Sequence, residues 1–457
     1  MKRHDICNFL FCAISVVVVF GSIFVFGLYS GAHRTFVYEF VDDIKVKIVD
    51  SFNITIEETP NLLGVYPKDF VQPARYEGEG VTINRAQNGQ DDLILLAGFF
   101  EDSNGLRLIR RDGTVVANWP VRFSEIISHP EQLLGSEVPA TDWNIDVHGA
   151  LALPDGSVVF NFEYGGLVKL DRCGNVVWTL ARRTHHSVEA AEGGGFWVPG
   201  RRYLPQTSGL PFPPFETPLQ EDTLLRVSED GAVIAEISVL QLFYDNGLET
   251  LLTATGYNFR QGMQWDREVV HLNKIDELSE GLAGDFPMFG AGDLALSLRE
   301  QNMVLVVDPD SGEIKWWKIG PWVRQHDPEF RKGGTIAVFN NNIYRSVFKN
   351  GSQISDTSIP RASNILEVNP ETNEHQVIYG HEKGQELLSV LRGNHEPTQG
   401  GGFLITEFEG GRVFETDSQG RVIWEYINRY SDDEVLEVTG ARIYPQSYFE
   451  VSDWRCE

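Results

Sequence analysis

A unit of short strands and tight turns recurs along this chain, about every 35 to 50 residues. Most units share one order: a histidine, a glycine-rich turn, an apolar strand, a strand that ends in Asp, a glycine turn and a strand that ends in Trp. With 44 glycines in the chain, this order predicts many short strands joined by turns. Six such units are expected: Asp92 to Trp119, Asp146 to Trp178, His185 to Val239, His271 to Trp317, His326 to Tyr379 and Asn394 to Trp424.

Sheets of this size cannot cover their edges or both faces alone, and stacking around a closed ring solves both problems. The sequence therefore predicts an all-β fold, a six-bladed β-propeller over residues 83–440, with a C-terminal tail over 441–457. Five or seven blades remain open, because insertions blur the edges of the fourth and fifth units. For the segment Leu272 to Leu282, a helix that lies across the top of the ring remains an alternative.

The N-terminus carries an uncharged apolar run, Phe9 to Tyr29, after a basic start. Its length of about 20 residues is enough to span a bilayer. A cleavable signal peptide usually has a shorter apolar core, although Tyr29 to Ala32 leaves cleavage open. We therefore expect residues 1–34 to be a cytoplasmic tip and transmembrane signal-anchor, and 35–82 a juxtamembrane stalk. The positive-inside rule then places the remaining chain in a periplasm or lumen, where membrane protein partners are conceivable.

The formal net charge of −27 excludes a nucleic-acid-binding surface as the main feature of the molecule, since such surfaces are basic. Two of the four cysteines, Cys7 and Cys12, belong to the apolar run or its flank. The other two, Cys173 and Cys456, form either one disulfide or two free thiols, and the sequence does not choose between them.

Histidines recur at one place in the repeat, where the chain enters the innermost strand of a blade. Equivalent positions in blades point to equivalent places, so these side chains should converge on one mouth of the central channel. The set is His148, His186, His326 and His395, joined by His271. Such a ring suits a metal site, a ligand-binding pocket, or a transferase with one neutral imidazole as nucleophile. Arg299 nearby disfavours a metal ion and favours an anion, because a fixed cation repels a second cation.

Four short motifs follow one another in the fourth and fifth units. They are His271-x-Asn273, Ser297-Leu298-Arg299, Asp308-Pro309-x-Ser311-Gly312-x-Ile314-x-Trp316 and Gln325-His326-Asp327. This order resembles the bacterial arylsulfate sulfotransferases, over roughly Val81 to Tyr426. Those proteins are β-propeller enzymes that move a sulfuryl group between phenols.

The resemblance implies a role for each matching residue. His326 matches the nucleophile that becomes a transient sulfohistidine, and Arg299 matches the cation that neutralises the sulfuryl oxygens. His271 and Asn273 match the pair that holds those oxygens. The pair His185-His186 matches an upstream His-His pair, with His186 as acid and base, although Ser187 replaces the acidic residue that follows in the family. We expect His148, His185 and His395 to contact the substrate.

The expected function is sulfuryl transfer from a phenolic sulfate ester to a phenol by a ping-pong route, without cofactor or metal. No P-loop sequence is present to hold a nucleotide sulfate donor. Two alternatives remain open. One is a catalytically silent, membrane-anchored propeller that serves as a binding or scaffold subunit of a membrane assembly. The other is a quinoprotein-like or metal-using propeller.

Overall fold

The computed structural model describes residues 15, 18–30, 59–61, 63–86, 91–205, 212–215, 217–253, 269–343, 346–349, 352–355 and 362–456. The chain forms two compact units, Met1–Tyr66 and Pro67–Glu457. In the first unit, residues 18–30 are helical, and the beginning of the expected apolar anchor lies outside the described residues. Among the helices of the described ranges, none combines the length and the apolar composition that crossing a membrane requires.

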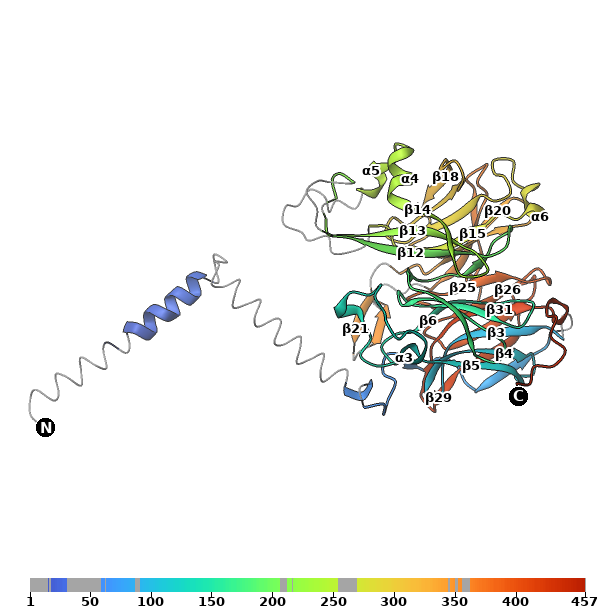
Figure 1. Cartoon of the computed structure of the whole chain (residues 1–457), viewed down its shortest axis with the longest axis horizontal. Helices are drawn as coiled ribbons and strands as arrows, with labels where there is room; N and C mark the ends of the chain where they lie inside the picture. Colours follow the sequence, from blue (N-terminus) through green and yellow to red (C-terminus); the bar gives the residue numbers. More distant parts are fainter. Residues whose placement is uncertain are drawn as a thin grey trace, which may run out of the picture. The chain divides into compact units, whose positions relative to one another are not determined.

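Antiparallel β-sheets make up the second unit, which confirms the expected all-β class (Figure 1). Six sheets of four or five strands follow one another through its described residues. The first three contain β31 (Val438–Tyr444), β3 (Leu93–Phe100), β4 (Ser103–Arg110) and β5 (Val115–Val121); β6 (Val147–Ala152), β7 (Val158–Phe162), β8 (Gly166–Leu170) and β9 (Val176–Leu180); and β10 (Arg183–Thr184), β11 (Glu189–Ala190), β12 (Phe196–Leu204), β13 (Leu219–Val227) and β14 (Val233–Ser238).

The other three sheets continue the series, in the order of the chain. They contain β15 (Leu272–Glu277), β16 (Leu294–Leu298), β17 (Met303–Val307) and β18 (Ile314–Ile319); β19 (His326–Arg331), β20 (Thr335–Asn340), β23 (Asn364–Val368) and β24 (His375–Tyr379); and β25 (Asn394–Pro397), β26 (Phe403–Glu407), β27 (Arg412–Thr416) and β28 (Val422–Ile427), with β2 (Gly80–Asn84) at its edge.

Small sheets and short helices decorate this series. The sheets are β1 (Val71–Pro73) with β30 (Glu434–Leu436) and β29 (Arg429–Ser431), and β21 (Ser346–Lys349) with β22 (Ser352–Ser355). The helices are α3 (Phe123–Ile126), α4 (Val239–Asp245), α5 (Glu249–Leu252) and α6 (Glu280–Ala283), with 3-10 turns at Gly135–Glu137 and Gln446–Tyr448. The segment Leu272 to Leu282, for which the sequence left a helix as an alternative, is a strand as far as Glu277. A short helix begins at Glu280.

The middle strands of each sheet feed two separate cores, because alternate side chains of a strand point to opposite faces. In β17, Met303 and Leu305 pack with the third sheet, whereas Val304 and Val306 pack with the fifth. All of β17 is buried, while the outer strand β9 is exposed at Val176 and Val177. Each sheet is thus covered on both faces by its neighbours.

Tryptophans at the outer strands pin one sheet to the next. The indole N–H of Trp119 donates to the Asp171 carbonyl of the second sheet at 3.0 Å, and that of Trp178 donates to Glu229 of the third sheet at 3.0 Å. Trp424 of the sixth sheet donates to the carbonyl of Arg111 in the first, at 2.8 Å. The last sheet therefore contacts the first. In the fourth sheet Trp316 is buried and Trp317 is exposed.

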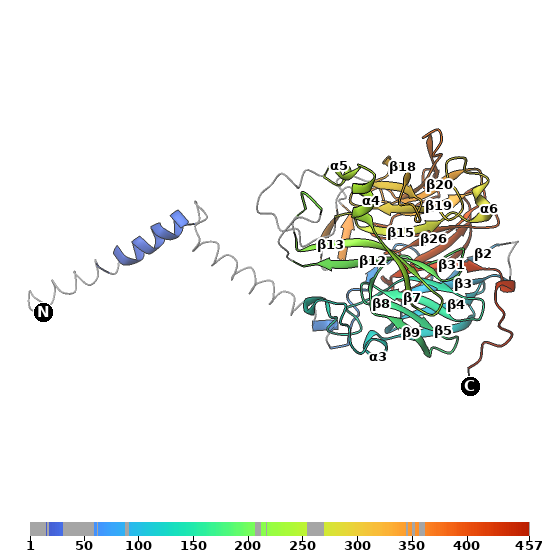
Figure 2. The ribbon, with the colours of Figure 1, turned by 45° about the horizontal axis from the view of Figure 1, so that its top comes forward.

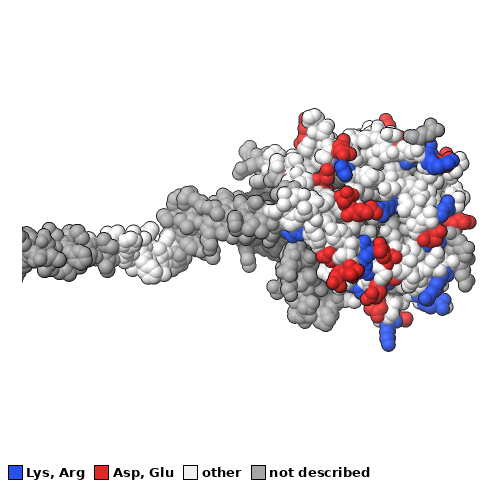
Figure 3. All heavy atoms as spheres, turned by 90° about the horizontal axis from the view of Figure 1, so that it is seen from below, with Lys and Arg blue, Asp and Glu red and all other residues white. Residues whose placement is uncertain are grey.

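The first sheet is completed by the end of the chain. Strand β31 pairs with β3 from Leu93 opposite Tyr444 onward, and the two strands lie side by side in Figure 1 and in Figure 2. Inner strands also meet in series: β31 contacts β6, β11 contacts β15, β15 contacts β19, β19 contacts β25, and β25 contacts β31. Figure 3 shows acidic and basic side chains interspersed over one face.

A disulfide joins Cys173, in the turn before β9, to Cys456 in the tail. This resolves the choice between a bond and two thiols. Trp454 of the tail lies edge-on to Phe449, with ring centroids 5.2 Å apart, so the tail also packs through its aromatic rings.

We expect Cys456→Ser to lower the free energy of unfolding by about 2–4 kcal/mol, because the bond restricts the unfolded chain. The measurement is urea unfolding of the full chain with and without reductant. Reductant should lower the midpoint of the wild type and leave the variant unchanged. Equal sensitivity of the two proteins would contradict the prediction.

Candidate active site

Four histidines from four sheets come together where the inner strands begin. The ring of His186 lies at the centre of the group. Its centroid is 4.0 Å from that of His148, 4.9 Å from that of His271 and 6.2 Å from that of His326. None of the four side chains is more than 6% exposed. We call His148, His186, His271 and His326 the histidine cluster.

The backbone around the histidine cluster departs from regular strand geometry. His186 and His271 have positive φ angles of 54° and 52°, which cost about 1–3 kcal/mol each for residues other than glycine. The ladder slips next to His148 and at His326, and such bulges redirect side chains. A Cβ on Gly149 would meet the carbonyl oxygen of His186 at 2.1 Å, so only glycine allows this approach. Local strain is therefore concentrated at the cluster.

Burial lowers the pKa of every histidine of the cluster below the usual value. For His326, burial and the nearby Arg299 guanidinium lower the pKa to about 3. Burial is the main cause of the low pKa of His271, and the same guanidinium lowers this pKa further. The imidazoles are consequently neutral near pH 7, and a neutral imidazole has a lone pair that can attack.

His326 makes two hydrogen bonds through Nδ1. Its partners are Oδ1 of Asn341 at 2.7 Å and the carbonyl oxygen of Arg324 at 3.2 Å. A carbonyl oxygen only accepts, so Nδ1 carries the ring proton. Nε2 is then the nitrogen with the free lone pair.

A second chain of contacts runs from His186 to a buried carboxylate. Nδ1 of His186 lies 2.8 Å from Nδ1 of His185, whose Nε2 lies 3.5 Å from Oδ1 of Asp222. Burial alone would raise the pKa of Asp222, but Arg201, with Nε at 2.9 Å, and His185 hold it below its usual value. The carboxylate therefore orients His185 with its proton on Nε2. His185 then accepts from His186, which leaves Nε2 of His186 free to exchange a proton.

Arg299 and Asn273 complete the predicted set on the fourth sheet. Arg299 follows β16, and its backbone N–H donates to the His271 carbonyl at 3.2 Å. Its guanidinium contacts Glu300 at 2.8 Å and is 15% exposed. The side-chain amide of Asn273 donates to the Gln325 carbonyl at 2.9 Å, beside His326.

His395 lies apart from the histidine cluster. Its Nδ1 is 3.2 Å from Oδ2 of Asp327, and its ring centroid is 5.4 Å from that of Phe403. Asp327 also pairs with the buried Lys274 at 3.0 Å. His395 is thus part of a buried ionic network, and the segment before the sixth sheet's first strand presents Arg392 to the cluster instead.

Two hollows meet at Arg392. The first, of about 70 Å³, is lined by His148, His186, Asn273, His326 and Arg392, among others. The second, of about 490 Å³, has Arg392 in its wall together with the aromatic side chains of Phe70, Trp143, Tyr164 and Phe408. The Tyr164 ring centroid lies 5.0 Å from that of His185, which contacts His186 of the cluster, so the aromatic hollow lies one residue away from the cluster. Its size falls in the range of small-molecule sites.

Comparison with known proteins assigns the chain. The model of the family described as Arylsulfotransferase (ASST) matches residues 149–429, which include the whole histidine cluster except His148. The chain belongs to the arylsulfotransferase family. No curated protein matches it.

Solved structures that are similar to this chain have low sequence identity to it. A protein of unknown function from Bacteroides caccae is 15% identical, with a TM-score of 0.43, over 74% of this chain and 93% of that one. Virginiamycin B lyase from Staphylococcus aureus is 12% identical, with a TM-score of 0.38, over 77% and 88%. A chain of a nidogen/laminin complex is 9% identical, with a TM-score of 0.41, over 77% and 98%.

The sequence did not reveal three residues of the candidate site: Asn341, Arg392 and Asp222. Arg392 had a signal, because it precedes a glycine at the start of the sixth unit, where other units present histidine. Asp222 had none, since it lies within β13 and meets His185 and the Leu272 backbone only through the folding of the chain. Within the described ranges, no three His, Cys, Asp or Glu side chains are arranged to hold a metal ion.

Proposed function

We propose that this arylsulfotransferase moves a sulfuryl group from an aryl sulfate ester to a phenol through a sulfohistidine at His326. The observation that carries the proposal is the state of this imidazole. It is buried and neutral, its proton is on Nδ1, and the Arg299 guanidinium acts on it. A neutral Nε2 beside a fixed cation is suited to attack a sulfur atom surrounded by anionic oxygens.

The first half-reaction forms the bond between Nε2 of His326 and sulfur, and breaks the bond from sulfur to the phenolic oxygen. His186, which takes up a proton at Nε2 from solvent as the donor binds, gives that proton to the departing phenolate. The negative sulfate ester raises the pKa of His186 when it enters, and Asp222 stabilises the imidazolium through His185. Loss of the phenol leaves the sulfohistidine and a neutral His186.

The second half-reaction is the reverse with another phenol. His186 takes the phenolic proton, the phenol oxygen attacks sulfur, and the electron pair of the N–S bond returns to Nε2 of His326. One group serves as acid and then as base, so the donor product leaves before the acceptor enters and the kinetics are ping-pong.

The remaining residues hold the substrate in this proposal. Arg299, His271 and Asn273 contact the sulfuryl oxygens, whose charge spreads as in phosphoryl transfer. The aryl rings of donor and acceptor bind in turn in the hollow lined by Trp143, Tyr164 and Phe408.

The finer fold belongs to the same proposal. We infer that the six sheets are the blades of a closed β-propeller, with β31 as the inner strand of the first blade. The Trp424 bond from the sixth sheet to the first and the serial contacts of the inner strands support a closed ring.

We also retain the proposal that Phe9 to Tyr29 anchors the protein, with the second unit on the extracytoplasmic side. Retention in the membrane fraction after alkaline extraction, with protease access from outside, tests it.

The family match favours an enzyme over a silent scaffold.

The deciding experiment uses the full chain with 4-nitrophenyl sulfate, with and without phenol. Release of 4-nitrophenol should depend on the phenol, and phenyl sulfate should appear in equal amount. Incubation with donor alone should add the mass of one SO3 group, and peptide mapping should place it on His326. Transfer that needs both substrates bound together, without such an adduct, would contradict the sulfohistidine route.

A further inference from the structure

The side chain of Asn341 links the proposed nucleophile to the next sheet. Asn341 follows β20 and is fully buried. Its Oδ1 lies 2.7 Å from Nδ1 of His326. Its Nδ2 donates to two carbonyl oxygens before β25, those of Ser389 at 2.9 Å and Arg392 at 2.7 Å. All three polar contacts of the amide group are therefore made within the protein.

These contacts fix which way the amide faces. Backbone carbonyls accept and never donate, so the nitrogen of Asn341 must face Ser389 and Arg392. Its oxygen must then face His326, and an amide oxygen also only accepts. The proton of His326 is therefore held on Nδ1, and the lone pair remains on Nε2. Rotation of the amide would set its two N–H groups against the ring, leave the Arg392 carbonyl without this donor and leave the Ser389 carbonyl only the Ser363 hydroxyl. A buried carbonyl without a donor costs about 1–3 kcal/mol.

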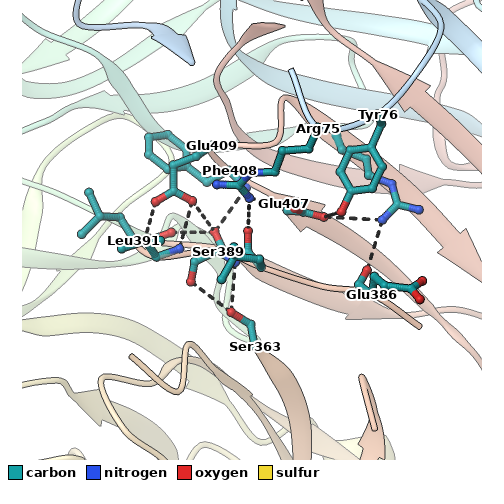
Figure 4. Close-up of polar contacts among 12 residues, drawn as sticks. Arg75, Tyr76, Ser363, Glu386, Ser389, Leu391, Glu407, Phe408 and Glu409 are labelled. Atoms are coloured by element: carbon teal, nitrogen blue, oxygen red, sulfur yellow. Dashed lines mark hydrogen bonds and ion pairs between the residues drawn. The ribbon is translucent and has the colours of Figure 1, made fainter. Parts of the chain in front are cut away.

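The segment that receives Asn341 is itself held by a buried carboxylate. Glu409 accepts from the backbone N–H groups of Val390 at 3.0 Å and Leu391 at 2.7 Å, and from the Ser389 hydroxyl at 3.1 Å (Figure 4). The Ser363 hydroxyl contacts the Ser389 carbonyl at 3.1 Å, as Figure 4 also shows. The carbonyls that orient Asn341 are thus fixed.

We propose that Asn341 is a positioning residue, which sets the tautomer of His326 so that Nε2 is the attacking atom. The inference rests on the proposed function for its role in turnover, although the tautomer itself is independent of any substrate. Asn341 does not contact the sulfuryl group and acts only through the ring of His326.

Asn428 gives the comparison that separates this role from simple support of the fold. It too is buried, and its Nδ2 donates to two carbonyls, those of Phe99 at 2.8 Å and Leu436 at 3.2 Å. It belongs to the junction of the sixth and first sheets, away from His326. The same substitution at Asn341 and at Asn428 therefore removes the same two donors, and only the first changes the partner of an imidazole.

The first experiment reads the tautomer directly in the full chain labelled with nitrogen-15 at histidine. The ring nitrogens of His326 are assigned with His326→Gln, and correlation spectra show which one is protonated. The wild type and Asn428→Ala should have the proton on Nδ1. Asn341→Ala should show both tautomers in exchange, because one of the two acceptors at Nδ1 is lost. An unchanged Nδ1 proton in folded Asn341→Ala would overturn the proposal.

The second experiment reads the consequence for turnover. Asn341→Ala should lower kcat by about 10- to 100-fold with KM little changed, as expected for removal of a group that orients a reactive side chain. Asn341→Asp should keep an acceptor at Nδ1 but place a negative charge there. That charge raises the pKa of His326, so the acidic limb of the kcat profile should move to higher pH. Asn428→Asp should leave the limb where it is.

These outcomes separate the two claims. Absence of transfer in the wild type, with the tautomer shift in Asn341→Ala intact, would refute the proposed function and leave Asn341 as the group that sets the ring. Normal transfer with the same tautomer and the same pH limb in all Asn341 variants would refute the positioning role alone.

Discussion

His326→Ala should lower kcat by at least about 10⁴-fold, the scale seen when a covalent nucleophile is removed. The substitution removes the atom that would form the N–S bond. His186 remains to protonate the leaving group, but no atom is left to attack the sulfur. The measurement is release of 4-nitrophenol with phenol present, together with the intact mass after incubation with donor alone. The SO3 adduct should be absent.

His395→Ala is the matched control for this result. His395 is as buried as the histidine cluster but contacts Asp327 and Phe403. The adduct should still form in this variant, even if its unfolding midpoint falls. An adduct that survives in His326→Ala, or vanishes equally in folded His395→Ala, would remove His326 from its role.

Arg299→Gln should lower kcat/KM by about 10²–10³-fold, the usual effect of losing one fixed donor to a developing anion. A second effect follows from the pKa of His326, which burial and the Arg299 guanidinium lower to about 3. Without the cation the pKa rises, so the ring becomes protonated at a higher pH. The active form is neutral, and the acidic limb of kcat/KM should therefore move upward in pH.

The controls for Arg299 use charge and contact separately. Arg299→Lys keeps the cation and should keep the acidic limb while losing part of the rate. Glu300→Gln removes the carboxylate 2.8 Å from the guanidinium and leaves the arginine in place, so the limb should not rise. A limb that stays fixed in Arg299→Gln would show that the guanidinium does not act on the nucleophile.

The sequence was sufficient to predict the fold class because each repeat unit carries the same kinds of turn. The glycine turns and the Trp-ending strands recur with a regular period, and each predicted unit covers most of the strands of one observed sheet. Pairing across the chain was beyond its reach. Nothing in Val438–Tyr444 indicates that this strand pairs with β3, because pairing between strands so far apart in the sequence leaves no local pattern.

The candidate site was predictable only as far as the repeat carries it. His148, His186, His271 and His326 meet because they enter inner strands at corresponding places. His395 was expected among them, yet it lies with Asp327, and Arg392 takes the place beside the cluster. Bulges and left-handed residues shift the direction of a side chain by one position, and counting along a sequence does not detect such shifts.

The pairing of β31 with β3 also determines when the protein is able to finish folding. During synthesis, β3 leaves the ribosome more than three hundred residues before its partner, so one edge of the first sheet stays open until Tyr444 has emerged. The second to fifth sheets are built from strands close together in the sequence and have no such wait. In a chain that stops short of Val438, β3 would have no partner along one edge. All residues of β3 are buried in the folded unit, so this unpaired apolar strand would be a template for aggregation. Pairing of β31 with β3 is thus a late checkpoint in the folding of this unit.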